Sequence, residues 1–144
     1  MQKSSLLQGV AVGVAAFVLA ACHSSKPVGA GSPMMAKAAP KPADVTPSNV
    51  AMGDSLFNKG NCQRCHGLLG VGGTGAPALD GKKWLQLKTG SYDEIVSIVT
   101  TGVPSVNIKD PTHKNPMGAR GGRAALTDPQ IKAVAAYVWT LSHK

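Results

Sequence analysis

The sequence has few of the residues from which a self-sufficient core or a carboxylate active site is built. Only six of its 144 residues are aromatic, and glutamate occurs once, at Glu94. Seven acidic residues stand against 15 basic ones, so metal–carboxylate sites and catalysis by paired carboxylates are disfavoured. The three cysteines are an odd number and cannot all pair as internal disulfides. A chain of this length has room for one domain and a tail.

The N-terminal apolar run is too short for an ordinary transmembrane helix. It covers residues 10–21 and follows a single lysine, Lys3. As a helix it would span about 18 Å, whereas a bilayer core is roughly 30 Å thick. A charged start, a short apolar run and small residues before a cleavage point are typical of a secretory signal peptide. We therefore expect residues 1–21 to be a targeting segment.

The end of this segment resembles the lipobox of bacterial lipoproteins. In Leu19-Ala20-Ala21-Cys22 an aliphatic residue and two small residues precede a cysteine. In lipoproteins that cysteine is lipidated and becomes the new N-terminus, which would account for the odd cysteine here. Two or more acyl chains hold a protein stably on a membrane. The alternatives are an uncleaved membrane anchor and plain secretion with a free thiol.

A tether is expected between this lipidation site and the folded domain. Residues 22–48 are dominated by Ala, Pro, Lys, Gly and Ser and have no apolar periodicity. Such a composition buries too little apolar surface to offset the entropy cost of ordering, so this stretch is predicted to be disordered. The folded domain is expected to cover residues 49–144.

Apolar side chains in residues 49–144 recur with helical periodicity in three places, and no run alternates as a strand would. Polar residues indicate where these helices begin. Ser48 and Ser91 are candidate N-caps, and Thr127 has the capping-box spacing to Gln130. A shorter helical turn is expected around residues 83–87. The expected helices run from Ser48 to Gly60, from Ser91 to about Thr101 and from Thr127 to Leu141.

Three helices joined by long glycine-rich loops cannot close a good core with so few large side chains. A C-x-x-C-H motif at Cys62, Cys65 and His66 indicates what fills it, because this is the attachment motif of c-type haem. Each thiol adds to one vinyl group of the same porphyrin, and the histidine lies beneath the iron as its proximal ligand. We therefore predict one covalent haem c.

Other interpretations of this cysteine pair have weaker support. A thioredoxin-type redox site would require a βαβ pattern around the pair, and none is present. A zinc site would require a second cysteine pair, which the sequence lacks. A disulfide is the third alternative in an exported protein. The adjacent His66, the export signal and the helical context together favour haem.

With this motif in place, residues 49–144 resemble a class I cytochrome c along nearly their whole length. Gly53 and Phe57 match the family's first helix, and residues 124–141 are similar to its last helix, which crosses the first. Pro77 matches the proline whose carbonyl accepts a hydrogen bond from the proximal histidine, an interaction that makes the ring a better donor to iron. The resemblance implies an all-α class I cytochrome c fold, with three main helices and long loops wrapped around a covalent haem c.

Two further positions follow from the resemblance. Trp84-Leu85 resembles a segment of the cytochrome c subunits of haem–copper oxidases, in which Trp84 would either donate to a haem propionate or pack in the core. Class I cytochromes take a distal methionine from the loop before the last helix, and Met117 is the only methionine after the haem motif. His113, otherwise a solvated loop residue, is the rival ligand, and a vacant position is the third alternative.

The function expected from these features is that of a one-electron carrier and not of an enzyme. It would be lipid-anchored on the periplasmic side of a bacterial cytoplasmic membrane, with membrane or periplasmic redox proteins as donor and acceptor. The alternatives are an open-site haem enzyme, a gas or peroxide sensor, and a fixed subunit of an oxidase or dehydrogenase. The formal charge of +8 would steer docking to an acidic partner or belong to a solvated surface. Nucleic acid is not an expected partner, because no binding motif is present.

Overall fold

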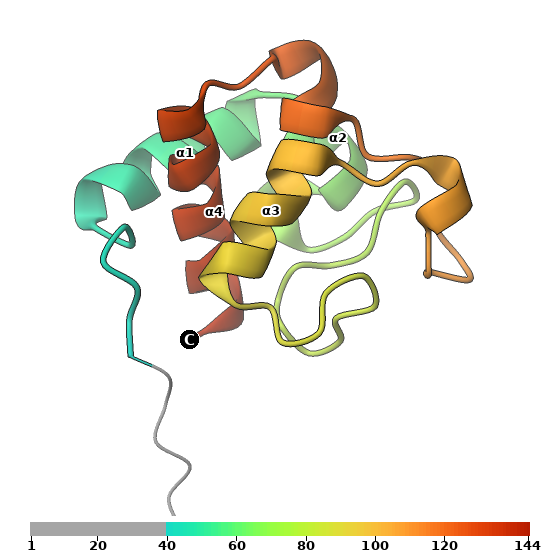
Figure 1. Cartoon of the computed structure of the whole chain (residues 1–144), viewed down its shortest axis with the longest axis horizontal. Coiled ribbons are helices and arrows are strands. Elements are labelled where there is room, and N and C mark those ends of the chain that lie inside the picture. Colours follow the sequence, from blue (N-terminus) through green and yellow to red (C-terminus); the bar gives the residue numbers. More distant parts are fainter. Residues whose placement is uncertain (1–39) are drawn as a thin grey trace, which may run out of the picture. The chain divides into compact units, whose positions relative to one another are not determined.

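The computed structural model describes residues 40–144, so the expected signal peptide, Cys22 and most of the expected tether lie outside it. The described part contains no β-strand, which confirms the expected all-α class. None of its helices has both the length and the apolar character of a membrane span. The helices are α1 (Pro47–Lys59), α2 (Cys62–His66), α3 (Tyr92–Thr101) and α4 (Asp128–Ser142), with short 3-10 segments at Leu68–Gly70, Ser105–Asn107 and Ala119–Ala124 (Figure 1).

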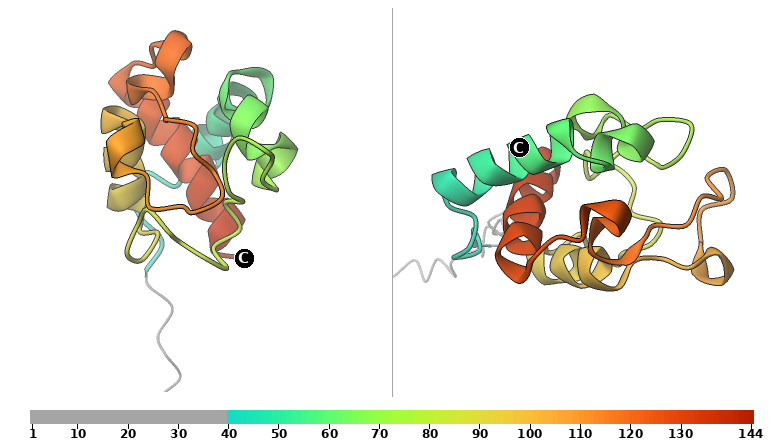
Figure 2. Two further views of the ribbon diagram at one scale, coloured as in Figure 1. Left: turned by 90° about the vertical axis from the view of Figure 1, so that its right-hand side faces the viewer. Right: turned by 90° about the horizontal axis from the view of Figure 1, so that it is seen from above.

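Helix α1 packs across α4, as the family resemblance implies (Figure 2). A methyl group at Gly53 would lie only 2.0 Å from the carbonyl oxygen of Ala133, so the two backbones meet where only glycine fits. One turn later the rings of Phe57 and Tyr137 lie 5.4 Å apart, centre to centre. The expected close approach of the first and last helices at Gly53 is confirmed.

Helix α1 begins earlier than the sequence indicated. Thr46, and not Ser48, is the N-cap, and its hydroxyl accepts a hydrogen bond from the backbone N–H of Asn49 at 3.2 Å. Pro47 occupies the first turn, where its missing N–H costs nothing. Val45 is only 1% exposed, so ordered packing starts before residue 49. Burial of one more aliphatic side chain offsets the cost of ordering these residues.

The two other expected helices begin where their caps were predicted. Ser91 precedes α3, and its hydroxyl accepts from the backbone N–H of Glu94 at 3.4 Å. Thr127 precedes α4, and its N–H donates to the side-chain oxygen of Gln130 at 2.9 Å. Residues 83–87, in contrast, contain bends but no helix, so that expectation was wrong.

The core lies where α4 packs against α1 and α3 (Figure 1). Every residue of α4 from Ala133 to Trp139 is buried. Phe57 of α1, Ile95 of α3 and Ile131 of α4 are each at most 2% exposed. Burial of each such side chain contributes roughly 1.5–3 kcal/mol. Phe57 and Ile95 also line a cleft beside this core.

Candidate functional site

An apolar cleft lies among the helices and the long loops. It encloses about 970 Å³ between the protein atoms, counting the part that opens to solvent. All four helices contribute to its walls, together with the segment 75–79 and the bends at 83–87. In place of the expected helical turn, this irregular segment brings Trp84, Leu85 and Leu87 to one wall of the cleft. The sequence has too few aromatic side chains to fill this space.

The C-x-x-C-H motif forms helix α2 beside this cleft. This short helix is not among those expected from the sequence, although the i, i+3 spacing of the two cysteines was a signal for a helical turn. Cys62 and His66 line the cleft, and Cys65 is half-buried next to them. Both cysteines are free of a disulfide. Burial raises the pKa of the Cys62 thiol above its ordinary value.

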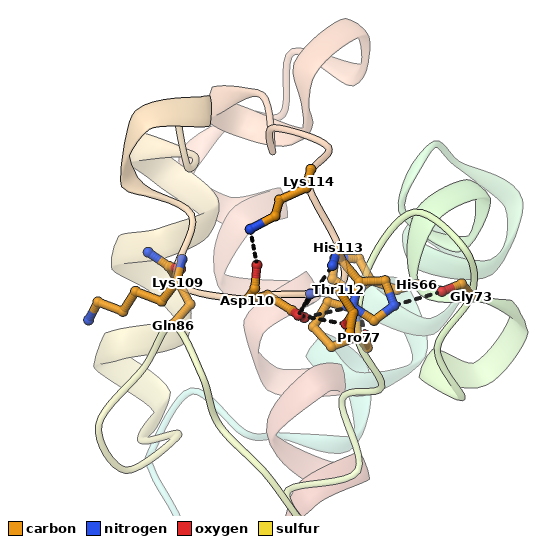
Figure 3. A network of polar contacts seen from close by, with 9 residues as sticks. All are labelled: His66, Gly73, Pro77, Gln86, Lys109, Asp110, Thr112, His113 and Lys114. Atoms are coloured by element: carbon orange, nitrogen blue, oxygen red, sulfur yellow. Dashed lines mark hydrogen bonds and ion pairs between the residues drawn. The ribbon is translucent and has the colours of Figure 1, made fainter.

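His66 is oriented by the chain that follows the motif. Its Nδ1 donates a hydrogen bond to the carbonyl oxygen of Pro77, 3.0 Å away (Figure 3). Burial lowers the pKa of His66, which favours the neutral ring. With hydrogen on Nδ1, the neutral ring carries its lone pair on Nε2, the form that a metal-ligating histidine requires. The hydrogen bond implied by the resemblance is therefore present, and iron ligation by His66 stays a prediction.

Met117 reaches the same cleft from the segment before α4. Its side chain is half-buried and lines the cleft together with His66. Its backbone pairs with Val103, just after α3. The fold thus brings the two predicted iron ligands to one cavity from positions 51 residues apart in the sequence. Ligation by Met117 itself stays a prediction.

His113 differs from the solvated loop histidine that was expected. Its Nδ1 lies 2.6 Å from Oδ2 of Asp110, and its Nε2 lies 3.1 Å from the carbonyl oxygen of Gly73 (Figure 3). The side chain is only 24% exposed. A ligand must offer iron a free ring nitrogen, and both nitrogens of His113 face protein oxygens, so this arrangement favours Met117 over His113.

Asp110 is a buried carboxylate that the sequence analysis did not single out. It is 5% exposed and lines the cleft. Its Oδ1 accepts from the N–H and the hydroxyl of Thr112 at 2.8 and 2.7 Å. Burial alone would raise the pKa of Asp110, but the hydrogen bonds from Thr112 and His113 outweigh it and hold the pKa well below its usual range. An aspartate two residues before a threonine in a Pro-containing loop was a signal for such an Asx turn.

These residues fit a covalent haem. Apolar side chains from all four helices form the walls, two thiols and an imidazole come from α2, and a thioether comes from the loop before α4. A flat porphyrin needs apolar walls, and soft thioether and imidazole donors suit iron at its two axial positions. Trp84 lines the same cleft and is half-buried, which suits either of the roles expected for it.

Comparison with known proteins gives a family for this arrangement. The model of the cytochrome c family matches residues 50–142. The cbb3-type cytochrome c oxidase subunit FixP of Bradyrhizobium diazoefficiens is 37% identical over 92 residues, 64% of this chain. Subunit FixPc of Rhizobium leguminosarum bv. viciae is 38% identical over 95 residues, 65% of this chain. The chain spans only 30% and 31% of these two relatives.

One solved structure shows a weaker likeness. It is cytochrome CL from the marine methylotrophic bacterium Methylophaga aminisulfidivorans MPT. The two chains are 22% identical, with a TM-score of 0.49. The matched region covers 66% of this chain and 54% of the other.

Proposed function

Because this chain belongs to the cytochrome c family, we propose that it is a membrane-tethered monohaem carrier of single electrons. It passes electrons between respiratory or photosynthetic membrane complexes, or from periplasmic dehydrogenases, on the outer side of a bacterial cytoplasmic membrane. The observation that carries this proposal is the meeting of the C-x-x-C-H helix and Met117 at one apolar cleft.

Five residues would hold the cofactor. Cys62 and Cys65 would bind haem c covalently, His66 and Met117 would ligate its iron, and Pro77 would orient His66. When bound, haem c supplies an iron that alternates between the ferric and ferrous states. The apolar cleft walls would exclude water from that iron, and the thioether of Met117 would favour its ferrous state and so raise the reduction potential.

The hydrogen bond from His66 to Pro77 has its own consequence. A carbonyl acceptor on Nδ1 holds the ring in one orientation and makes Nε2 a stronger donor to a metal. The ring therefore keeps its position when the charge of the metal changes. An electron carrier returns to its starting state after each transfer, so its structure should change little between the two oxidation states.

The membrane attachment is proposed from the N-terminal sequence. Residues 1–21 are a lipoprotein signal peptide, Cys22 carries the lipid, and the tether lies between Cys22 and the folded domain. A tether keeps the carrier at high effective concentration near membrane partners. Lys26, Lys37 and Lys41 favour contact of the tether with anionic lipid.

A fixed subunit of an oxidase is the second candidate function. Two relatives carry the printed name of a cbb3-type cytochrome c oxidase subunit, which favours it. Extraction of native membranes with a gentle detergent distinguishes the two. Co-purification with an oxidase in constant stoichiometry supports the subunit, and release as a single species supports the carrier.

The carrier proposal is tested on the mature protein from its natural membranes. We expect covalently bound haem, a single reversible one-electron transition, and slow binding of carbon monoxide to the reduced protein. A colourless protein whose Cys62 and Cys65 both react with an alkylating reagent would contradict the proposal. Rapid carbon monoxide binding by the native protein would favour the open-site enzyme or sensor.

A further inference from the structure

We propose that His113 is a positioning residue that fastens the segment carrying Met117 to the segment after the haem motif. This inference rests on the proposed function, because it assigns His113 a task at the haem site. The two segments, residues 110–117 and 73–77, are about 40 residues apart in the sequence. The ring of His113 joins them through its Nε2, 3.1 Å from the carbonyl oxygen of Gly73 (Figure 3).

The ring of His113 is held from its other side by a fixed carboxylate. Oδ2 of Asp110 lies 2.6 Å from Nδ1, while Oδ1 is occupied by the N–H and hydroxyl of Thr112. The backbone carbonyl of Asp110 accepts from Nζ of Lys114 at 3.0 Å. Asp110 is buried, so the carboxylate has little room to turn. The ring therefore points at Gly73 because Asp110 orients it.

The chemistry of the two contacts makes His113 hard to replace. A carboxylate oxygen and a carbonyl oxygen can only accept, so a ring with hydrogen on both nitrogens makes both bonds. The shorter of the two contacts is the one to the carboxylate of Asp110. Asparagine at this position could donate to Asp110 but would not extend to Gly73.

The same two segments meet at a second point. The side-chain nitrogen of Asn115 lies 3.2 Å from the place where a methyl group on Gly75 would be. Gly73 is itself fixed, since its N–H donates to the carbonyl of Ala76 at 3.0 Å. The next residue, Pro77, is the acceptor for His66. His113 therefore links the segment of the distal ligand to the turn that orients the proximal one.

Apart from the His113 contact, the hydrogen bonds that join this segment to other described parts of the chain lie at or just beyond its ends. Gln86 binds the backbone of Asn107 and Lys109 at 3.0 and 3.1 Å, and Val103 pairs with the backbone of Met117. Loss of the His113 contact would leave these ends in place while the middle moves away from Gly73. We expect such movement to make Met117 leave the iron more often without unfolding the domain.

The test uses the holoprotein and measures how fast added ligands reach the iron. Imidazole binding to the ferric protein and carbon monoxide binding to the ferrous protein both require Met117 to detach. For His113→Asn, which keeps a partner for Asp110, and for His113→Ala, we expect both rates to rise about tenfold, the factor expected from loss of one hydrogen bond. Hydrogen exchange at the N–H of Thr112, in the middle of this segment, should rise in parallel. His143→Ala, on the histidine stacked on Trp139, is the control and should change neither.

The outcomes separate this inference from the proposed function. Unchanged binding rates and unchanged exchange in both His113 variants would overturn the positioning role of His113 and leave the carrier proposal intact.

Met117→Ala gives the upper limit of the binding rates. Wild-type rates equal to that limit would show that Met117 is not a ligand, and the positioning role would fail with it. Absence of covalent haem in the wild-type protein would instead refute the proposed function.

Discussion

Met117 and Val103 exchange two backbone hydrogen bonds, of 3.0 Å from the N–H of Met117 and 2.8 Å from the N–H of Val103. The pair ties the loop before α4 to the end of α3. It requires glycine at position 102, where φ is +71° and a methyl group would lie 2.4 Å from the carbonyl oxygen of Met117. The predicted distal ligand is therefore held through its backbone by a partner 14 residues earlier.

Met117→His should lower the reduction potential. Imidazole stabilises ferric iron relative to a thioether, so the potential should fall by roughly a tenth or more of the ~0.8 V range that axial ligands set. A redox titration followed by visible absorbance measures it. Met52→Leu, on an exposed methionine of α1, is the matched control and should leave the potential as it is. An unchanged potential in Met117→His would remove Met117 from the iron.

Gly53→Ala should destabilise the domain where α1 crosses α4. The added methyl would lie 2.0 Å from the carbonyl oxygen of Ala133 and 2.9 Å from Cβ of Tyr137, so the helices must separate. We expect the free energy of unfolding to fall by roughly 2 kcal/mol or more, as for other overpacked sites. Urea unfolding of the holoprotein measures it, with Ser55→Ala on the exposed face of α1 as control. Equal stability of Gly53→Ala and the wild type would contradict this packing.

Glu94 should make stability depend on pH in the acid range. Hydrogen bonds from the backbone and hydroxyl of Thr89, with further N–H donors at Lys88, Gly90 and Ser91, lower the pKa of Glu94 to about 2. Because this pKa lies below the ordinary value of 4.5, the stabilisation is complete above pH 4.5 and is lost as pH falls toward 2.

Glu94→Gln tests that pH dependence. The variant should be less stable than the wild type at pH 7, and the difference should shrink between pH 4.5 and 2. Urea unfolding at several pH values gives both quantities. Asp93→Asn, on the exposed neighbour in the same helical turn, is the matched control. A difference that stays constant down to pH 2 would show that ionised Glu94 has no special role in the fold.

Cys22→Ser should release the domain from membranes. Serine cannot carry the thioether-linked lipid, and the tether alone has too little apolar surface to bind a bilayer stably. Fractionation of cells into membrane and soluble parts, with haem absorbance as the marker, measures the release. Retention of Cys22→Ser in the membrane fraction would refute the lipobox interpretation.

Local patterns in the sequence were sufficient for the elements whose causes are themselves local. The capping boxes at Ser91 and Thr127 depend on residues three positions apart, and both helices begin there. The haem motif lies within five residues, and thus needed no tertiary information. The predicted N-cap at Ser48 failed because burial of Val45, a long-range effect, favoured an earlier start at Thr46.

Contacts between distant segments could not be predicted in the same way. Asp110 and His113 are polar residues in a loop, and nothing in their neighbourhood indicates that Asp110 is buried or that Gly73 lies across from His113. The bends at residues 83–87 likewise serve a cleft whose other walls come from all four helices.

The order of residues along the chain was enough to establish the helical class, the haem attachment motif and the methionine available as distal ligand, because spacing and side-chain chemistry are properties of short stretches. The meeting of His66 and Met117 at one cleft, and the contact of His113 with Gly73, depended on how the helices and loops pack. Those contacts join residues far apart in sequence, so they form, and stabilise the protein, only when the chain folds around its core.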